Sequence, residues 1–154
     1  MAKESWMGGC QCGAVRYELM ARPDKPCICH CRMCQKQFGN FFGSFAGVDL
    51  QYFKLLRGQI KYFKSSDHGE RGFCGDCGTP LAYRSLESGN VSVSIGSLDR
   101  HSEMQPLVQY GVEAREPWFA LLANLPASET GKNPIDDPKK YESIKASNRQ
   151  HPDH

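Results

Sequence analysis

Short segments rich in β-branched and aromatic residues recur along the chain, with turn-forming residues between them. The segment 90–95 shows the pattern most clearly, because Val91, Val93 and Ile95 alternate with two serines. An alternation with a period of two puts the apolar side chains on one face of a β-strand. From this pattern and from residue composition we predict strands at 14–19, 41–48, 52–56, 59–64, 80–84 and 90–95.

Helical patterns are few. We predict one short helix at 32–38, which starts among several cysteines, and a second helix that begins near Pro117. Between two of the predicted strands, Arg57-Gly58 indicates a turn, because glycine adopts a positive φ freely. The predicted fold class is therefore mainly β, with one or two short helices.

The composition changes near residue 127. The segment 127–154 carries three prolines and charges of both signs, with few apolar residues to bury. A short helix at 141–149 fits this segment and would lie on the surface. We therefore expect one domain at 1–126, followed by a polar C-terminal tail at 127–154.

Charge and hydropathy narrow the classes of partner. The chain has 154 residues and a net charge of +2, which gives no reason to expect nucleic acid as a partner. The longest uncharged runs, 37–48 and 117–128, have twelve residues each, against roughly 20 for a membrane-spanning helix. The first residues lack the apolar core of a signal peptide. We therefore expect no membrane partner and a cytoplasmic location.

Eight cysteines are the unusual feature of the composition. They are too sparse for a disulfide scaffold, and in a reducing compartment clustered cysteines more often bind metal than each other. A Cys-x-x-Cys turn such as Cys74 to Cys77 folds two thiolates to one side, as tetrahedral zinc requires. The cysteines fall into three groups: Cys10 and Cys12; Cys27, Cys29, Cys31 and Cys34; Cys74 and Cys77.

Spacing alone leaves two ways to pair these groups into zinc sites. In one, Cys10, Cys12, Cys74 and Cys77 form a closed site, and Cys29, Cys31 and Cys34 form another. In the other, Cys10, Cys12, Cys27 and Cys29 pair locally, which leaves Cys31, Cys34, Cys74 and Cys77. The difference matters because four cysteines close the coordination of zinc, whereas three leave a position for water or substrate.

Three stretches around these cysteines form a wider pattern: Gly9-Cys10-Gln11-Cys12-Gly13-Ala14-Val15-Arg16-Tyr17, Cys29-His30-Cys31-Arg32-Met33-Cys34-Gln35-Lys36 and Phe73-Cys74-Gly75-Asp76-Cys77-Gly78-Thr79-Pro80-Leu81. Together they resemble the glutathione-dependent formaldehyde-activating enzymes, a family that includes S-(hydroxymethyl)glutathione synthase and centromere protein V. Weaker matches extend the resemblance as far as residue 126.

The resemblance implies a zinc-bearing fold of two small β-sheets and selects the first pairing. It implies a structural zinc on Cys10, Cys12, Cys74 and Cys77, and a second, catalytic zinc on Cys29, Cys31 and Cys34. The implied activity is that of a carbon–sulfur lyase that acts on the adduct of glutathione with formaldehyde or a related aldehyde. Glutathione is then the co-substrate. The resemblance leaves open whether two copies of the chain form a homodimer.

Cys27 decides between this enzyme and an alternative function. A ligating Cys27 would close the second site and favour a non-catalytic, zinc-stabilised binding module, as the resemblance to centromere protein V allows. We expect Cys27 to be a small buried strand residue instead. A thiol-redox enzyme similar to methionine sulfoxide reductase B is a weaker alternative, because only Cys27 is spare as a nucleophile.

Several neighbouring residues have two interpretations. His30 is expected to be exposed or to support a ligand rather than to bind metal, and Gln109 stands where the family often has a histidine. Core packing is the default for six aromatic residues in this part of the chain. The floor of a substrate pocket is a second interpretation for four of them, Phe38, Phe41, Phe42 and Phe45. The six aromatic residues are Phe38, Phe41, Phe42, Phe45, Trp118 and Phe119. Three cations, Arg16, Lys36 and Arg71, could meet the carboxylates of glutathione, but nothing in the sequence distinguishes them from solvated charges, and they are left unassigned.

Overall fold

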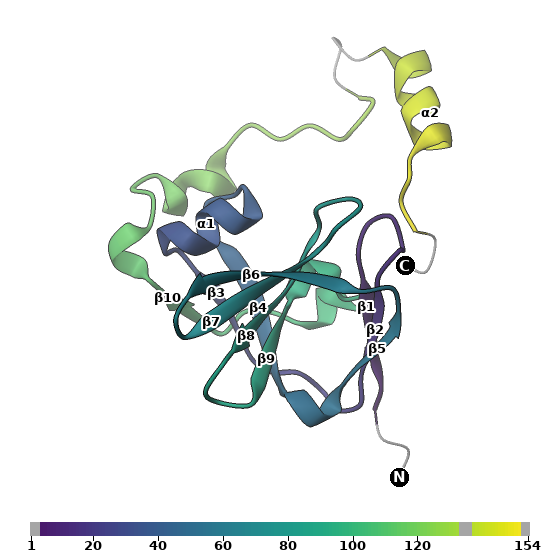
Figure 1. The fold of residues 1–154 in the computed structure, drawn as a ribbon. Coiled ribbons are helices and arrows are strands. Elements are labelled where there is room, and N and C mark those ends of the chain that lie inside the picture. Colours follow the sequence, from purple (N-terminus) through teal and green to yellow (C-terminus); the bar gives the residue numbers. More distant parts are fainter. Residues whose placement is uncertain (1–3, 133–136, 152–154) are drawn as a thin grey trace.

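The computed structural model describes residues 4–132 and 137–151. Of the segments predicted above, the start of the domain at 1–3 and the parts of the tail at 133–136 and 152–154 lie outside the described residues. Figure 1 shows two β-sheets with short helices around them, so the prediction of a mainly β fold with two sheets is confirmed.

The smaller sheet has three antiparallel strands in the order β1-β2-β5, and the larger has seven in the order β10-β3-β4-β9-β8-β7-β6. All neighbours in the larger sheet are antiparallel except β10 and β3, which are parallel. The strands are β1 (Trp6–Gly9), β2 (Arg16–Leu19), β3 (Asp24–Cys29), β4 (Gly43–Asp49), β5 (Phe53–Arg57), β6 (Ile60–Ser66), β7 (Gly69–Cys74), β8 (Pro80–Ser85), β9 (Asn90–Ser94) and β10 (Val108–Tyr110).

Helix α1 spans Arg32–Phe38, as the sequence predicts, and ends at Gly39 in the left-handed conformation. The segment after Pro117 forms a 3₁₀ helix rather than an α-helix, and the tail helix α2 spans Pro138–Ser147. The 3₁₀ helices are η1 (Leu50–Tyr52), η2 (Ile95–Ser97), η3 (His101–Glu103), η4 (Val112–Ala114) and η5 (Phe119–Asn124).

The hydrophobic core lies where the two sheets meet. Trp6, Tyr17 and Leu19 from the small sheet are fully buried, together with Leu81 and Val93 from the large sheet. The Tyr17 hydroxyl lies 2.7 Å from the Ser97 hydroxyl, which satisfies its polar group. The alternation of apolar residues in β9 therefore points into this core, as the sequence pattern predicts.

A buried ion pair fixes the end of the small sheet. Arg16 in β2 donates to Asp99, with 2.9 Å between Nη1 and Oδ1, and only 8% of its side chain is exposed. Both charges are compensated within the fold, which a buried charge requires. Arg16 is thus a structural residue and is not free to meet a substrate carboxylate.

The sequence pattern missed four strands, for identifiable reasons. In β7, Gly69 and Gly72 interrupt the apolar alternation, because other side chains occupy the space of a Cβ atom: a Cβ at Gly69 would lie 2.3 Å from the Tyr83 hydroxyl. Strand β3 contains a proline and two cysteines instead of β-branched residues. Strands β1 and β10 have only four and three residues.

The position of Trp118 differs from the expectation that this side chain packs in the core. Trp118 is 39% exposed and does not belong to the core. Its ring meets the edge of Phe41, with 4.6 Å between centroids, and Phe41 is itself exposed. These rings cover the outside of the α1 region rather than fill the interior.

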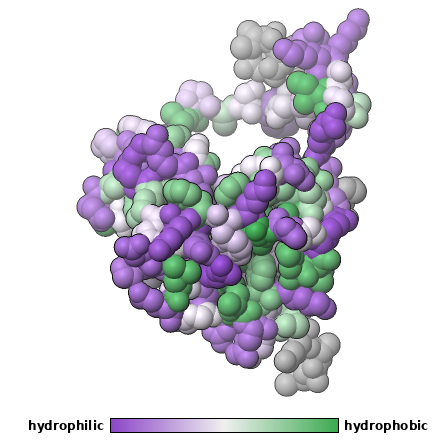
Figure 2. All heavy atoms as spheres, viewed as in Figure 1, coloured by the Kyte–Doolittle hydropathy of each residue, from purple (hydrophilic) through white to green (hydrophobic). Residues whose placement is uncertain are grey.

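The C-terminal tail leaves the body and returns to it. In Figure 1 helix α2 stands apart from the sheets, and in Figure 2 its region is coloured mainly as hydrophilic. After this helix the His151 N–H donates to the Gln11 carbonyl at 2.7 Å. Across residues 4–132 and 137–151, no helix is long and apolar enough to span a membrane.

The turn at Gly58 offers a test of the fold. Gly58 has a φ of +72°, and a Cβ atom there would lie 2.0 Å from the Ala14 carbonyl oxygen. We expect Gly58→Ala to lower the free energy of unfolding by about 3 kcal/mol, from backbone strain and overpacking together. Gly89→Ala is the matched control: its φ is +66° but its Cβ would meet nothing within 4 Å. Gly89→Ala should lower the free energy of unfolding, measured by urea denaturation, by only about 1 kcal/mol. Equal losses in the two variants would contradict the close contact between Gly58 and Ala14.

Candidate metal centres

The two half-sites at the ends of β1 and β7 meet in one cluster. The Sγ atoms of Cys10, Cys12, Cys74 and Cys77 all lie within 4.8 Å of one another. Cys10 and Cys12 follow β1 of the small sheet, whereas Cys74 ends β7 of the large sheet. The structure thus brings together the four cysteines of the first sequence-based pairing.

The spacing of these sulfurs suits zinc. With Zn–S bonds of about 2.3 Å, a tetrahedron has an S–S edge of about 3.8 Å. The Sγ atoms of Cys10 and Cys12 are 3.6 Å apart, and those of Cys12 and Cys74 are 3.9 Å apart. Both distances are far too long for a disulfide and match the tetrahedral edge.

Backbone amides support the same sulfurs. The Val15 N–H donates to the Cys10 sulfur at 3.2 Å, and the Asp76 N–H donates to the Cys74 sulfur at 3.4 Å. Such bonds orient ligands and stabilise thiolate charge. Burial raises the pKa of the Cys10 thiol to about 12, so this thiol needs a nearby cation to ionise at neutral pH. The donor set, its spacing and its amide bonds therefore fit a bound zinc ion.

The second cluster lies where β3 passes into α1. Cys29 ends the strand, Cys31 caps the helix and Cys34 lies in its first turn, and their Sγ atoms are within 4.8 Å of one another. Cys27 is not a member of this cluster, although it lies two residues before Cys29 on the same strand. Among the described residues the cluster offers three thiols, a donor set that zinc accepts with one position left over.

A buried arginine lies directly against this second cluster. Arg71 in β7 is only 6% exposed, and its Nη1 and Nη2 atoms donate to the Cys34 sulfur at 3.6 and 3.7 Å. The Gln37 side-chain oxygen accepts a further bond from Nη1 at 2.6 Å, and the Tyr83 ring lies 5.4 Å from the guanidinium carbon. Three thiolates with one Zn²⁺ would carry a net charge of −1, which this guanidinium would balance.

Arg71 also acts on the thiols. Burial raises the pKa of the Cys34 thiol to about 12, while the guanidinium works in the opposite direction. Burial also opposes ionisation of Cys31, but bonds from Cys34 and Cys29 and the charge of Arg71 outweigh it and lower the pKa of that thiol. This role could not be predicted from the sequence, because Arg71 is 37 positions from Cys34 and no local pattern links the two.

His30 lies between two cysteines of the second cluster in the sequence, and its side chain points into the protein interior. Its side chain is fully buried, and Nε2 lies 3.0 Å from the Gln109 side-chain oxygen. The Phe119 ring packs edge-on against it, with 4.8 Å between centroids. His30 is not part of either cysteine cluster, and it is buried, which corrects the expectation of an exposed residue. Gln109 is its hydrogen-bond partner.

A cavity opens beside the second cluster. We call it the cysteine cavity; it has a volume of about 330 Å³. Of the four phenylalanines considered for the floor of a substrate pocket, Phe45 alone lines this cavity. Its ring packs edge-on against Phe38. Its other lining residues include Cys27, Cys29, Cys31, Cys34, Arg71, Tyr83, Ser92 and Tyr110. The cluster thus borders a space that a small molecule can enter.

Comparison with known proteins agrees with this architecture. Residues 5–113 match the family model described as glutathione-dependent formaldehyde-activating enzyme. The chain belongs to this family. This chain is also similar to the crystal structure of a Rhodobacter sphaeroides protein, with a TM-score of 0.55 and 18% sequence identity. The likeness covers 67% of this chain and 98% of that chain, and it shows the fold.

The two clusters should differ in what their loss does to the protein. Cys74→Ser should unfold the domain, because it removes one of four ligands that join the two sheets. Cys31→Ser should keep the fold and lose one metal ion. Circular dichroism and elemental analysis after purification in a reducing buffer without chelator would measure both effects. A folded Cys74→Ser protein would contradict a structural role for the first cluster.

Arg71 should control metal retention at the second cluster. We expect Arg71→Gln to weaken zinc binding there by about 10–100-fold, the usual effect of losing a group that supports a ligand. Arg71→Lys should retain part of the affinity because it keeps the charge. Competition with a chromophoric chelator measures this, and Arg84→Gln is the control, since Arg84 binds Glu70 elsewhere on the same sheet. An unchanged affinity in Arg71→Gln would show that Arg71 only fills space.

Proposed function

We propose that this protein is a zinc-dependent carbon–sulfur lyase that makes or breaks the bond between glutathione and formaldehyde or a related aldehyde. One observation carries the proposal: in a member of this family, a three-cysteine cluster backed by a buried arginine borders a cavity of about 330 Å³. Family membership supports glutathione and formaldehyde as reactants. The lyase class and the role of each residue are our inference.

The two clusters would then have separate roles. Cys10, Cys12, Cys74 and Cys77 supply four ligands, which close the coordination of zinc and leave it a structural role. Cys29, Cys31 and Cys34 would hold the catalytic ion and leave one position toward the cysteine cavity. A zinc ion bound there supplies a Lewis acid that favours the ionised form of a thiol.

The addition itself is balanced in protons. The glutathione thiol loses a proton, its sulfur bonds to the aldehyde carbon, and the former carbonyl oxygen takes up a proton. Arg71 cannot act as the base because a guanidinium stays protonated. Its charge would stabilise negative charge on sulfur beside Cys34, from a buried position fixed by Gln37 and Tyr83.

The position of Cys27 supports an enzyme rather than a binding module. A module needs no open metal position, and Cys27 would have to join the second cluster to close it. Cys27 instead lines the cysteine cavity, outside the set of three sulfurs that lie within 4.8 Å of one another. Its thiol is half-buried and lines a cavity, so Cys27 is a strand residue that is less buried than expected.

We also propose a reducing location such as the cytoplasm. All eight cysteines are free, and seven of them belong to the two clusters. A thiolate cluster of this kind requires thiols that are not oxidised to disulfides.

A direct test measures the reaction with the intact protein. Zinc-loaded wild-type protein should accelerate the exchange of ¹³C-formaldehyde with its glutathione adduct, as followed by NMR. Cys31→Ser should return the exchange to the uncatalysed rate while its circular dichroism stays native. Cys27→Ser should keep two zinc ions per chain. A wild-type protein that holds both ions and accelerates nothing would refute the proposed function.

A further inference from the structure

Strand β3 carries an irregularity that changes which residues face the sheet surface. Cys27 pairs with Phe45 of β4, but Asp24 pairs with Gly47, so one extra residue is inserted between them. Lys25 lies in this insertion with a φ of +45°, the one non-glycine residue with positive φ in residues 4–132 and 137–151. A bulge of this kind re-aims side chains, and strain of this kind often accompanies function.

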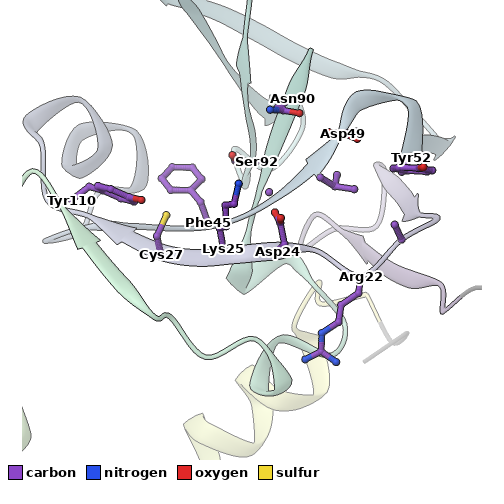
Figure 3. A pocket seen from close by; sticks show the side chains of 13 residues that line it. Arg22, Asp24, Lys25, Cys27, Phe45, Asp49, Tyr52, Asn90, Ser92 and Tyr110 are labelled. Carbon is purple, nitrogen blue, oxygen red and sulfur yellow. The ribbon is translucent and has the colours of Figure 1, made fainter. Parts of the chain in front are cut away.

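The bulge turns two consecutive charged side chains toward the same space. Neighbours in a regular strand point to opposite faces, yet Asp24 and Lys25 both line a cavity of about 420 Å³, which we call the charged cavity. In Figure 3 both side chains rise into this space, Lys25 between Phe45 and Ser92. Within the described part of the chain, neither charge has an ion-pair partner.

The charged cavity adjoins the cysteine cavity on the same sheet. The two share four lining residues: Cys27, Phe45, Ser92 and Tyr110. A ligand with its sulfur at the second cluster can therefore extend along the sheet, past Phe45, to the pair of charges at the bulge. In Figure 3 Cys27 and Tyr110 lie at one end of the lining of the charged cavity, and Asp24 and Asn90 lie further along it, beyond Phe45 and Lys25.

Gly47 keeps the floor of the charged cavity open. It pairs with Asp24 on one side and with Ser92 on the other, so the three residues form a row across β3, β4 and β9. A Cβ atom at Gly47 would lie 3.3 Å from the Asp24 Oδ1 atom. The missing side chain leaves room for a ligand between the carboxylate and the serine hydroxyl.

We propose that the charged cavity binds the γ-glutamyl end of glutathione, with Lys25 on its α-carboxylate and Asp24 on its α-ammonium group. The proposal rests on the proposed function, which places the glutathione sulfur at the second cluster. The glycine end of glutathione offers one carboxylate and no ammonium group. A cation and an anion side by side complement the zwitterionic γ-glutamyl end and leave the glycine end toward solvent.

Fragments of glutathione test the orientation. Isothermal titration calorimetry of the zinc-loaded wild-type protein under anaerobic conditions would compare glutathione, γ-glutamylcysteine and cysteinylglycine. We expect γ-glutamylcysteine to bind within about threefold of glutathione and cysteinylglycine to bind about tenfold more weakly or worse, since it lacks two charge-assisted bonds. The reverse order would place the glycine carboxylate at Lys25 and overturn the proposal.

Variants at the bulge test the residues. Lys25→Asn removes the charge but tolerates a positive φ, and it should weaken glutathione about tenfold while leaving cysteinylglycine unchanged. Lys54→Asn, an exposed cation on the other sheet, should change neither affinity. Lys25→Gly should melt no lower than wild type, because glycine relieves the strain, and yet lose glutathione affinity like Lys25→Asn. An unchanged glutathione affinity in both Lys25 variants would overturn the proposal.

The failure of this inference is distinct from failure of the proposed function. If wild-type protein and Lys25→Asn exchange formaldehyde equally well and bind glutathione equally tightly, the proposed function stands and the role of Lys25 is refuted. If the zinc-loaded wild-type protein binds none of the three thiols, the proposed function is refuted and this inference falls with it.

Discussion

The structure depends on four sulfurs that must converge from two different sheets. Cys10 and Cys12 follow the first strand of the small sheet, while Cys74 and Cys77 come more than sixty positions later, from the end of a strand in the large sheet. Burial disfavours the thiolate form at Cys10, so the convergence needs a cation to offset the cost of charge. A metal ion bound by these four sulfurs would tie the two sheets together.

Strand β7 links the two clusters. It delivers Cys74 to the first cluster at its end and Arg71 to the second cluster three residues earlier. The glycines of this strand let Tyr83 and Ile60 pack directly on its backbone. Arg71 is therefore fixed by the same strand pairing that brings Cys74 to its partners. The same strand therefore contacts both clusters.

The sequence predicts those parts of the molecule that follow from local pattern or short spacing. The alternating valines of β9, the helix that ends at Gly39 and the turn at Gly58 all depend on neighbouring residues, and all are present. The grouping of Cys10 and Cys12 with Cys74 and Cys77 needed the family resemblance, because spacing allowed a second pairing equally well. The structure brings the first grouping together.

The remaining features depend on contacts between distant residues. No local pattern marks Arg71 among nineteen lysines and arginines, and only the fold brings it against Cys34. The bulge at Lys25 is likewise invisible in the sequence, because it arises from the register of β3 against β4. Tryptophan is a residue type common in protein cores, yet Trp118 packs against Phe41 on the surface. The thiols could therefore be located from the sequence, whereas the positions of the charged groups around them could not.

The central claim is that the protein holds two zinc ions, one closed by four cysteines and one bound by three. X-ray absorption at the zinc edge, combined with elemental analysis of wild-type protein, tests it directly. The account predicts two zinc ions per chain and an average of about 3.5 sulfur neighbours per zinc at about 2.3 Å, with the remainder a lighter atom. A single zinc per chain, or four sulfurs around every zinc, would contradict the open second site on which the chemistry depends.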